Sequence, residues 1–286
     1  SFESPFITKN LSLISGIADV VVFVGGISPS LEGEEMKVSE SGFKGGDRTD
    51  IELPQAQRKV MKMLHRAGKR VVFVNCSGSA IAMVPETENA ESILQAWYPG
   101  ERGGEAVAKV LFGEVNPSGK LPVTFYKSTS DLPDFLDYTM KNRTYRYFKG
   151  EALFPFGHGL SYTSYEYGKP TLNKVKSEER RVKNSSAYSL SFSLSNKGNR
   201  EGTEVAQVYI RRMDDAEGPI KTLKAFKRIT LKAGEKQQVT ISLPRQSFEG
   251  WDSQTNTMRV VPGKYQIFVG GSSAEAAKNV IEVKVK

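Results

Sequence analysis

The chain has 286 residues, of which 38% are hydrophobic, 25% are charged and 10% are aromatic. This length suits two domains, and the composition is typical of folded globular proteins rather than disordered or membrane proteins. The longest apolar run, residues 18–24, is interrupted by Asp19. A transmembrane helix requires about 20 apolar residues, so we expect no membrane span. Ser1 is not an initiator methionine and no charged-then-apolar leader follows it, which fits a processed protein or a piece of a longer one.

The net charge of +8 is unevenly distributed along the chain. Residues 1–168 carry 18 lysines and arginines against 20 aspartates and glutamates, whereas residues 169–286 carry 22 against 12. A basic face in contact with solvent explains this excess, with contact to a polyanion or an acidic surface as the alternative. Because the excess of positive charge is confined to the C-terminal part, we expect no nucleic-acid partner.

Cysteine and histidine are scarce. Cys76 is the only cysteine, which excludes an internal disulfide and a Cys-rich zinc or iron–sulfur site. His65 and His158 are the only histidines, so we predict neither a metal site nor a cofactor. His65 falls on a predicted helix and His158 in the turn-like sequence FGHG, while Cys76 ends a predicted strand and is expected to be an inert thiol.

The first part of the chain alternates strand-like and helix-like segments. Residues 18–26 are nearly continuous in β-branched and apolar residues, which predicts a strand covered on both faces. A helix is predicted over 54–68, a strand over 70–75, another strand over 92–98 and a helix over 104–113. This order indicates a mostly parallel α/β sheet.

After residue 113 the pattern changes to turns and aromatics, which predicts an irregular connector lying over the first domain. From residue 188 short alternating strands follow one another, separated by turn signals at 196–198, 233–234 and 262–263. Such spacing is typical of an antiparallel β-sandwich. We therefore predict an α/β domain with its connector at 1–168 and an all-β domain at 169–286.

The loop that follows the first predicted strand, residues 25–54, is the leading candidate for a functional site. Ligands of open α/β sheets lie beyond the carboxyl ends of the strands. The loop holds seven carboxylates: Glu32, Glu34, Glu35, Glu40, Asp47, Asp50 and Glu52. Crowded carboxylates raise one another's pKa, which suits a general acid, although simple solvated charges remain the alternative. A phosphate site is disfavoured, because no glycine-rich phosphate motif is present and the carboxylates would repel the anion.

The order of the motifs gives the sequence a family resemblance. The motifs are VVVFVGG, LEGEEM, GGDRTDIELPQAQ, KRVVFVNCSGS, ILQAWYPGERGGEAVAKVLFGEVNPSGKLPVTF, YRYF and FPFGHGLSYTSYEY, followed by EVAQVYI, LKAFKRITLKAGE and PGKYQIFVG. In this order they resemble the C-terminal part of glycoside hydrolase family 3, the retaining β-glucosidases, β-xylosidases and related exo-acting enzymes. The last three resemble the immunoglobulin-like fibronectin type III-like domain that ends many members.

The resemblance implies an α/β sandwich whose loop reaches over a neighbouring (β/α)₈ barrel. In the family a barrel aspartate, in an S-D-W-type motif, is the nucleophile, and a glutamate of the sandwich is the acid/base. This sequence contains no such motif and too few residues for the barrel, so it resembles a fragment that is inactive alone. The family's sandwich begins with an earlier strand and a glycine-rich loop, and neither precedes Ser1, so the first domain can lack its first strand.

The acid/base glutamate follows from the family pattern E-x-E-x-x-D-R. Here E-x-E is present as Glu32-Gly33-Glu34, but D-R comes later, as Asp47-Arg48, after an apparent insertion at 37–46. Alignment on E-x-E selects Glu34 as the general acid/base, with Glu35 and Glu32 as rivals. The resemblance gives Asp47 and Arg48 the role of fixing the loop, through pairing of the guanidinium with a carboxylate, with an ordinary surface pair as the alternative.

The implied substrate is an oligosaccharide or aryl β-glycoside with a terminal β-linked glucose or xylose, and polysaccharide-degrading relatives are commonly periplasmic or secreted. The alternative is a non-catalytic carbohydrate-binding or structural module. Such a platform needs several exposed aromatics on one face of the β-sandwich, whereas its only tryptophan, Trp251, falls in a predicted loop. The other aromatics alternate as core residues do: Tyr188, Phe192, Tyr209, Tyr265 and Phe268.

Overall fold

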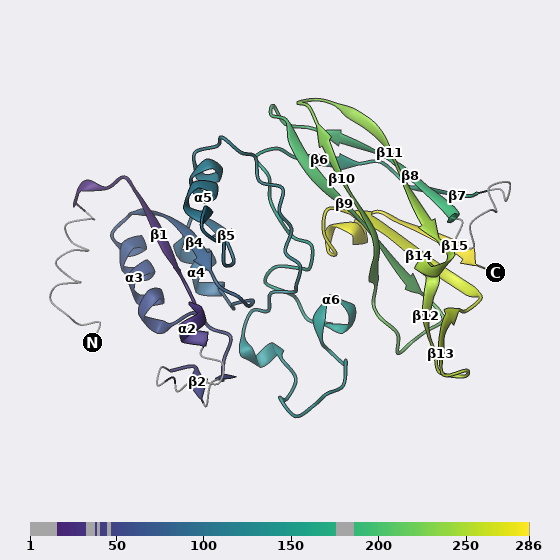
Figure 1. Ribbon diagram of the computed structural model, residues 1–286, viewed down its shortest axis with the longest axis horizontal. Helices are drawn as coiled ribbons and strands as arrows, with labels where there is room; N and C mark the ends of the chain where they lie inside the picture. The colour runs from purple at the N-terminus through teal and green to yellow at the C-terminus, as the bar shows by residue number, and fades with distance from the viewer. Residues whose placement is uncertain (1–15, 33–37, 39–40, 45–46, 176–185, 286) are drawn as a thin grey trace. The chain divides into compact units, whose positions relative to one another are not determined.

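The computed structural model describes residues 16–32, 38, 41–44, 47–175 and 186–285, which form two compact units (Figure 1). The first unit holds the chain up to residue 112 together with 125–135 and 150–153, and the second holds 113–124, 136–149 and everything from 154 onwards. The connector is thus divided between the units. The sequence boundary at residues 168 and 169 stays a prediction.

The first unit contains a three-stranded parallel sheet in the order β1-β4-β5. The strands are β1 (Val20–Gly26), β4 (Arg70–Cys76) and β5 (Ser92–Gln95). The predicted parallel α/β architecture is therefore confirmed. The third strand ends earlier than the predicted 98 because the backbone of Trp97 enters the left-handed region, at φ 55°.

Three helices accompany this sheet: α3 (Gln55–Arg66), α4 (Val84–Asn89) and α5 (Gly103–Leu111). Helix α3 lies beside β1, β4 and α4 (Figure 1). It follows Pro54 and buries Met61 and Leu64. The apolar spacing of the sequence predicts α3 and α5. Helix α4 has no apolar stripe and is not predicted.

Strand β1 departs from the prediction that both of its faces are covered. Val20, Val22 and Val24 are 44%, 51% and 66% exposed, whereas Phe23, on the other face, contacts Phe73 with ring centroids 5.8 Å apart. Helix α3 covers the Phe23 face, and within the described part of the chain nothing comparable covers the valine face. An unbroken apolar run therefore does not establish that a strand is buried on both sides.

The second unit is an antiparallel β-sandwich, as predicted. One sheet has the order β10-β9-β14-β15 and the other the order β11-β8-β6, with β7 also pairing with β8. The strands are β6 (Tyr165–Tyr167), β7 (Thr171–Lys174), β8 (Ser186–Asn196), β9 (Gly202–Arg212), β10 (Thr222–Leu231), β11 (Lys236–Pro244), β14 (Gly263–Gly270) and β15 (Val280–Val285). A separate ribbon is formed by β12 (Glu249–Asp252) and β13 (Thr257–Val260).

The five aromatics predicted to be core residues of the sandwich are all buried: Tyr188, Phe192, Tyr209, Tyr265 and Phe268. Only Tyr188, Phe192 and Tyr265 belong to the core between the two sheets. Tyr209 and Phe268 lie on the outer face of their sheet and pack with Tyr145 and Phe156 of the connector, rather than with the other sheet. The Tyr145 and Phe156 rings are stacked, with centroids 4.1 Å apart. These contacts explain why most of the connector belongs to the second unit.

The turn at residues 155–158 is fixed against β9 by Gly157. Its φ of +79° and its close approach to Gln207 leave no room for a side chain, because an added Cβ would lie 2.0 Å from Gln207 Oε1. Gln207 Nε2 donates to the Gly157 carbonyl oxygen at 3.1 Å. The next residue, His158, stacks on Phe154 with ring centroids 5.3 Å apart. The sequence FGHG is therefore a structural turn, as predicted.

His158 should make the stability of the second unit depend on pH. Burial lowers its pKa below the usual 6.5, with repulsion from Lys120 adding to this effect and Glu275 opposing it. Below about pH 6.5 His158 binds a proton in the unfolded chain but not in the folded chain. The free energy of unfolding therefore falls as the pH drops towards the lowered pKa. We expect His158→Gln to flatten this fall in urea titrations between about pH 7.5 and pH 5. Equal slopes for the wild-type protein and His158→Gln would contradict the prediction.

Candidate functional site

Three loops meet at the carboxyl ends of the parallel strands in the first unit. The loop after β1 continues into the short helix α2 (Pro29–Glu32), the loop after β4 carries Ser79, and the loop after β5 carries Tyr98. Helix α2 begins where Leu31 N donates to Ser28 Oγ at 3.2 Å. Because parallel strands bring their carboxyl ends to one edge, these loops converge although they lie far apart in the sequence.

Glu32 is held by the two neighbouring loops. The Tyr98 hydroxyl lies 2.9 Å from both Glu32 Oε2 and the Ile27 carbonyl oxygen, and Ser79 Oγ donates to Glu32 Oε1 at 3.2 Å. Burial, and then the hydrogen bond to Glu32, raise the pKa of Tyr98, so its hydroxyl remains a donor. Gly78 permits this approach, since an added Cβ would lie 2.7 Å from the Tyr98 ring. The start of the acidic segment is therefore fixed.

Arg48 extends the cluster from the other end of the acidic loop, where β2 (Phe43–Lys44) pairs with β3 (Asp47–Arg48). Its Nη1 donates to Ser79 Oγ at 3.3 Å and its Nη2 to the Glu52 carbonyl oxygen at 2.9 Å. Burial lowers the pKa of Arg48, while nearby carboxylates oppose the shift. Its Nε is buried without a hydrogen-bond partner in the described part of the chain.

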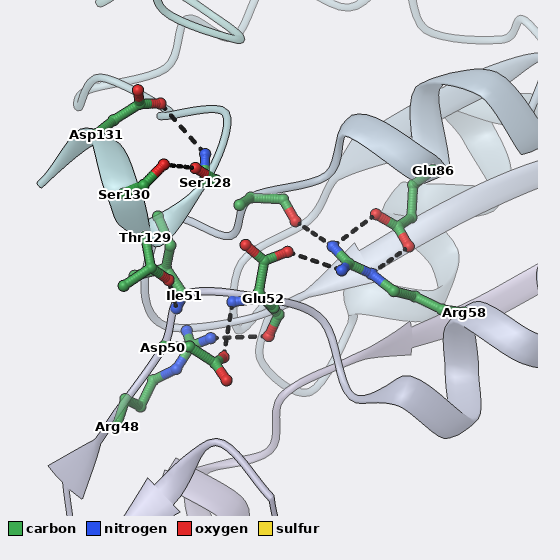
Figure 2. A network of polar contacts seen from close by, with 11 residues as sticks. Arg48, Asp50, Ile51, Glu52, Arg58, Glu86, Ser128, Thr129, Ser130 and Asp131 are labelled. Carbon is green, nitrogen blue, oxygen red and sulfur yellow. Dashed lines mark hydrogen bonds and ion pairs between the residues drawn. The ribbon is translucent and has the colours of Figure 1, made fainter.

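The segment after Arg48 is tied down by a second arginine, Arg58 of α3 (Figure 2). Arg58 Nη1 lies 2.7 Å from Glu52 Oε2, its Nε lies 3.0 Å from Glu86 Oε1, and its Nη2 donates to the Ala82 carbonyl oxygen at 2.7 Å. Glu86 is 1% exposed, and burial raises its pKa while Arg58 opposes the shift. Arg58 thus joins the acidic loop to α4.

Two further hydrogen bonds fix the same segment. Glu52 N donates to Asp50 Oδ1 at 3.0 Å, and Ile51 N donates to Thr129 Oγ1 at 3.1 Å (Figure 2). Thr129 belongs to the short 3₁₀ helix η1 (Thr129–Asp131), which is closed by a capping box between Ser128 and Asp131. Both described ends of the acidic loop are therefore anchored to the first unit.

The predicted site residues differ in where they lie. Glu34 and Glu35 lie outside the described residues, so their predicted roles stay predictions. Glu32 is in the cluster. Asp47 is exposed, and no side-chain hydrogen bond or ion pair is found for it among the described residues. Arg48 contacts a hydroxyl and a carbonyl oxygen in the described part, and its predicted pairing with a carboxylate stays a prediction.

Sequence reasoning missed Ser79, Tyr98 and Arg58. The available signal for Ser79 and Tyr98 was their position just after two predicted parallel strands, at the edge where the acidic loop also starts. Arg58 carries no such signal, because one arginine on an amphipathic helix resembles any solvated cation.

Across the described ranges, no three His, Cys, Asp or Glu side chains are grouped to hold a metal ion. No helix in the described part has the length and apolar character of a membrane crossing.

Curated relatives share the sequence over most of its length. A xylan 1,4-beta-xylosidase of Xylanibacter ruminicola is 52% identical over 267 residues, which cover 93% of this chain and 30% of the relative. A periplasmic beta-glucosidase of Salmonella typhimurium is 34% identical over 279 residues, covering 93% of this chain and 34% of the relative. The chain thus spans about a third of the length of these relatives.

Solved structures and family profiles give the same assignment. A beta-glucosidase of Kluyveromyces marxianus matches with a TM-score of 0.83 and 28% identity, over 100% of this chain and 34% of that one. A family 3 beta-glucosidase of Bifidobacterium adolescentis matches with a TM-score of 0.84 and 27% identity, over 100% of this chain and 42% of that one. The Glycosyl hydrolase family 3 C-terminal domain profile matches residues 10–162, and the Fibronectin type III-like domain profile matches residues 204–273. The chain therefore belongs to glycoside hydrolase family 3, of which it holds a C-terminal domain and a fibronectin type III-like domain.

Proposed function

We propose that this chain is part of a retaining, exo-acting β-glycosidase that removes terminal β-linked xylose or glucose, and that it supplies the general acid/base. The observation that carries the proposal is the anchoring of the acidic loop at the carboxyl edge of the sheet, through Glu32 at one end and Arg48 at the other. Membership of the family and the 52% identity to a protein named as a xylan 1,4-beta-xylosidase support it.

The contacts of Glu32 favour Glu34 as the acid/base. Both carboxylate oxygens of Glu32 accept hydrogen bonds, from Tyr98 and Ser79, so Glu32 serves to hold the segment. A general acid must instead carry a proton and reach the glycosidic oxygen. Glu34 follows two residues later and Glu35 is its rival. Tyr98, Ser79 and Arg48 then act as positioning residues.

The second carboxylate comes from outside this chain in our proposal. A retaining glycosidase places its nucleophile and its acid/base about 5–5.5 Å apart, which requires accurate docking of the acidic loop against the partner. We assign the nucleophile to an aspartate of a (β/α)₈ barrel in the longer protein. The acid/base first protonates the departing oxygen and then deprotonates the water that releases the sugar. A periplasmic or secreted location is part of the proposal, supported by the relative named as periplasmic.

A chimeric enzyme tests this function. The C-terminal 30% of the Xylanibacter ruminicola relative that matches this chain is replaced by it, and the chain alone is assayed in parallel. We expect the chimera to release p-nitrophenol from p-nitrophenyl β-xyloside or β-glucoside and the chain alone to release none. A chimera that is folded by circular dichroism but inactive would contradict the proposal. Multiple turnovers by the pure chain would show that it needs no second domain.

A further inference from the structure

The β-sandwich unit contains a cavity that the proposed hydrolysis does not use. Its volume is about 340 Å³, within the range of roughly 300–1,000 Å³ that is common for small-ligand sites. The walls come from the β12–β13 ribbon, from β9 and β10, and from the short helix α6 (Thr144–Tyr147) of the connector. All of these elements belong to the second unit.

One wall of the cavity is aromatic and held in place. Trp251 is 53% exposed and pairs in register with Met258, and Tyr147 of α6 lines the same cavity. The ribbon is fixed beside Trp251 by Asp252, whose carboxylate accepts hydrogen bonds from Arg259 and from Thr255 Oγ1. An exposed indole on a fixed backbone offers a flat face at little entropic cost. The apolar C–H face of a sugar ring fits such a surface.

The cavity is also lined by cations with unused hydrogen-bonding capacity. Arg146 and Arg211 form no ion pair within the described part of the chain, and the Nε atom of each is buried without a partner. Arg212, a third arginine of the wall, pairs with Asp215 at 2.9 Å. A guanidinium binds a carboxylate through two parallel hydrogen bonds, so Arg146 and Arg211 are suited to an anionic group of a ligand.

The rest of the lining decides between classes of anion. Lys224 Nζ donates to the Glu249 carbonyl oxygen at 3.0 Å, and burial followed by repulsion from Arg146 lowers the pKa of Lys224. The acidic residues Glu217 and Glu249 also line the cavity. They would repel a chain of phosphates but can accept hydrogen bonds from sugar hydroxyls. Proteins that bind single-stranded nucleic acid instead present a long basic groove with successive aromatics.

We propose that this cavity binds an acidic glycan, with one sugar ring stacked on Trp251 and the carboxylate of a uronic acid held by Arg146 and Arg211. The excess of basic residues in 169–286, which the hydrolytic site does not use, favours the approach of such an anionic polymer. The recognition is independent of the proposed hydrolysis. Only the choice of a xylan-type probe rests on that function.

The test is a calorimetric titration of the 286-residue chain, which requires no catalysis. The probes are xylotriose carrying glucuronic acid, plain xylotriose, trigalacturonate, inorganic phosphate and a single-stranded oligonucleotide. We expect both acidic glycans to bind, and plain xylotriose and phosphate to bind at least about tenfold more weakly. Trp251→Ala and Arg211→Gln should each weaken acidic-glycan binding about tenfold. The matched controls Phe226→Ala, which removes an aromatic that is 64% exposed, and Lys236→Gln, at an exposed site on β11, should stay within about twofold.

Several results would overturn the proposal. The first is that the folded wild-type chain binds neither acidic glycan. The second is that it binds plain xylotriose as tightly as the acidic glycans. The third is that it binds phosphate as tightly as the acidic glycans and that Trp251→Ala does not weaken this phosphate binding. Preferential binding of the oligonucleotide would assign the surface to nucleic acid and overturn it too. Circular dichroism checks that each variant is folded. A second test needs no variant. Added salt should weaken binding of the acidic glycans to the wild-type chain, because salt screens the contact between the carboxylate and the arginines.

Discussion

Replacing Glu34 by alanine in the chimeric enzyme is expected to slow the hydrolysis of glycosides with poor leaving groups by about 10²–10⁴-fold, the usual contribution of a general acid. An alkyl xyloside needs a proton on its departing oxygen, whereas a dinitrophenolate leaves without one. For dinitrophenyl glycosides, the rate of the first step, in which the glycosyl-enzyme forms, should therefore fall less. Deglycosylation then becomes limiting, because no base remains to deprotonate water.

Azide distinguishes this role from a structural one. As a nucleophile that needs no base, azide should partly restore turnover of the dinitrophenyl substrate by the Glu34→Ala chimera and yield a glycosyl azide. Glu32→Gln and Glu35→Ala are the matched variants on either side, and neither should show azide rescue. If Glu35→Ala shows the leaving-group dependence and the rescue while Glu34→Ala stays near wild type, the acid/base is Glu35.

Replacing Arg58 by methionine is expected to lower the free energy of unfolding of the first unit by about 3 kcal/mol or more. Methionine roughly keeps the volume of the side chain, but it leaves Glu86, which is 1% exposed, without its cation. It also removes the hydrogen bond to the Ala82 carbonyl oxygen and the ion pair to Glu52. A buried carboxylate without a partner is far costlier than the ion pair is stabilising.

The pH dependence and a matched variant check this explanation. Burial already raises the pKa of Glu86, and loss of Arg58 should raise it further. A carboxyl with a raised pKa in the folded state lowers the free energy of unfolding as the pH rises through that pKa. The loss of stability in Arg58→Met should therefore be larger near about pH 7.5 than near about pH 5. Arg58→Met combined with Glu86→Gln should recover part of the loss in urea titrations. Arg66→Met, at an exposed site on the same helix, should change stability by less than about 0.5 kcal/mol; equal effects at 58 and 66 would contradict the explanation.

The sequence predicts the architecture well where side-chain periodicity reflects burial. Met61 and Leu64 mark α3, and the alternation through Phe192 and Tyr265 marks the sandwich. Prediction from the sequence fails where a side chain packs against a segment that is distant in the chain. Tyr209 alternates as a core residue should, yet it packs against the connector, because a strand pattern does not say which partner covers each face.

The candidate site was predictable in place but not in its contacts. The acidic loop after the first strand, and the rule that sites lie at carboxyl edges, locate the cluster around Glu32. The partners Ser79 and Tyr98 are 47 and 66 residues away along the chain, so no local spacing links them to Glu32. The family motif W-Y-P-G includes Tyr98, but a motif does not reveal that its hydroxyl donates to a carboxylate.

Strand β1 has a practical consequence for anyone who purifies this chain. The side chains of Val20, Val22 and Val24 are 44%, 51% and 66% exposed on one face of this strand, and an exposed apolar stripe favours association between copies of the chain. Concentrated stocks should therefore self-associate on storage. Val22→Thr, which keeps the β-branched shape while adding a hydroxyl, is the change to try first for a longer shelf life.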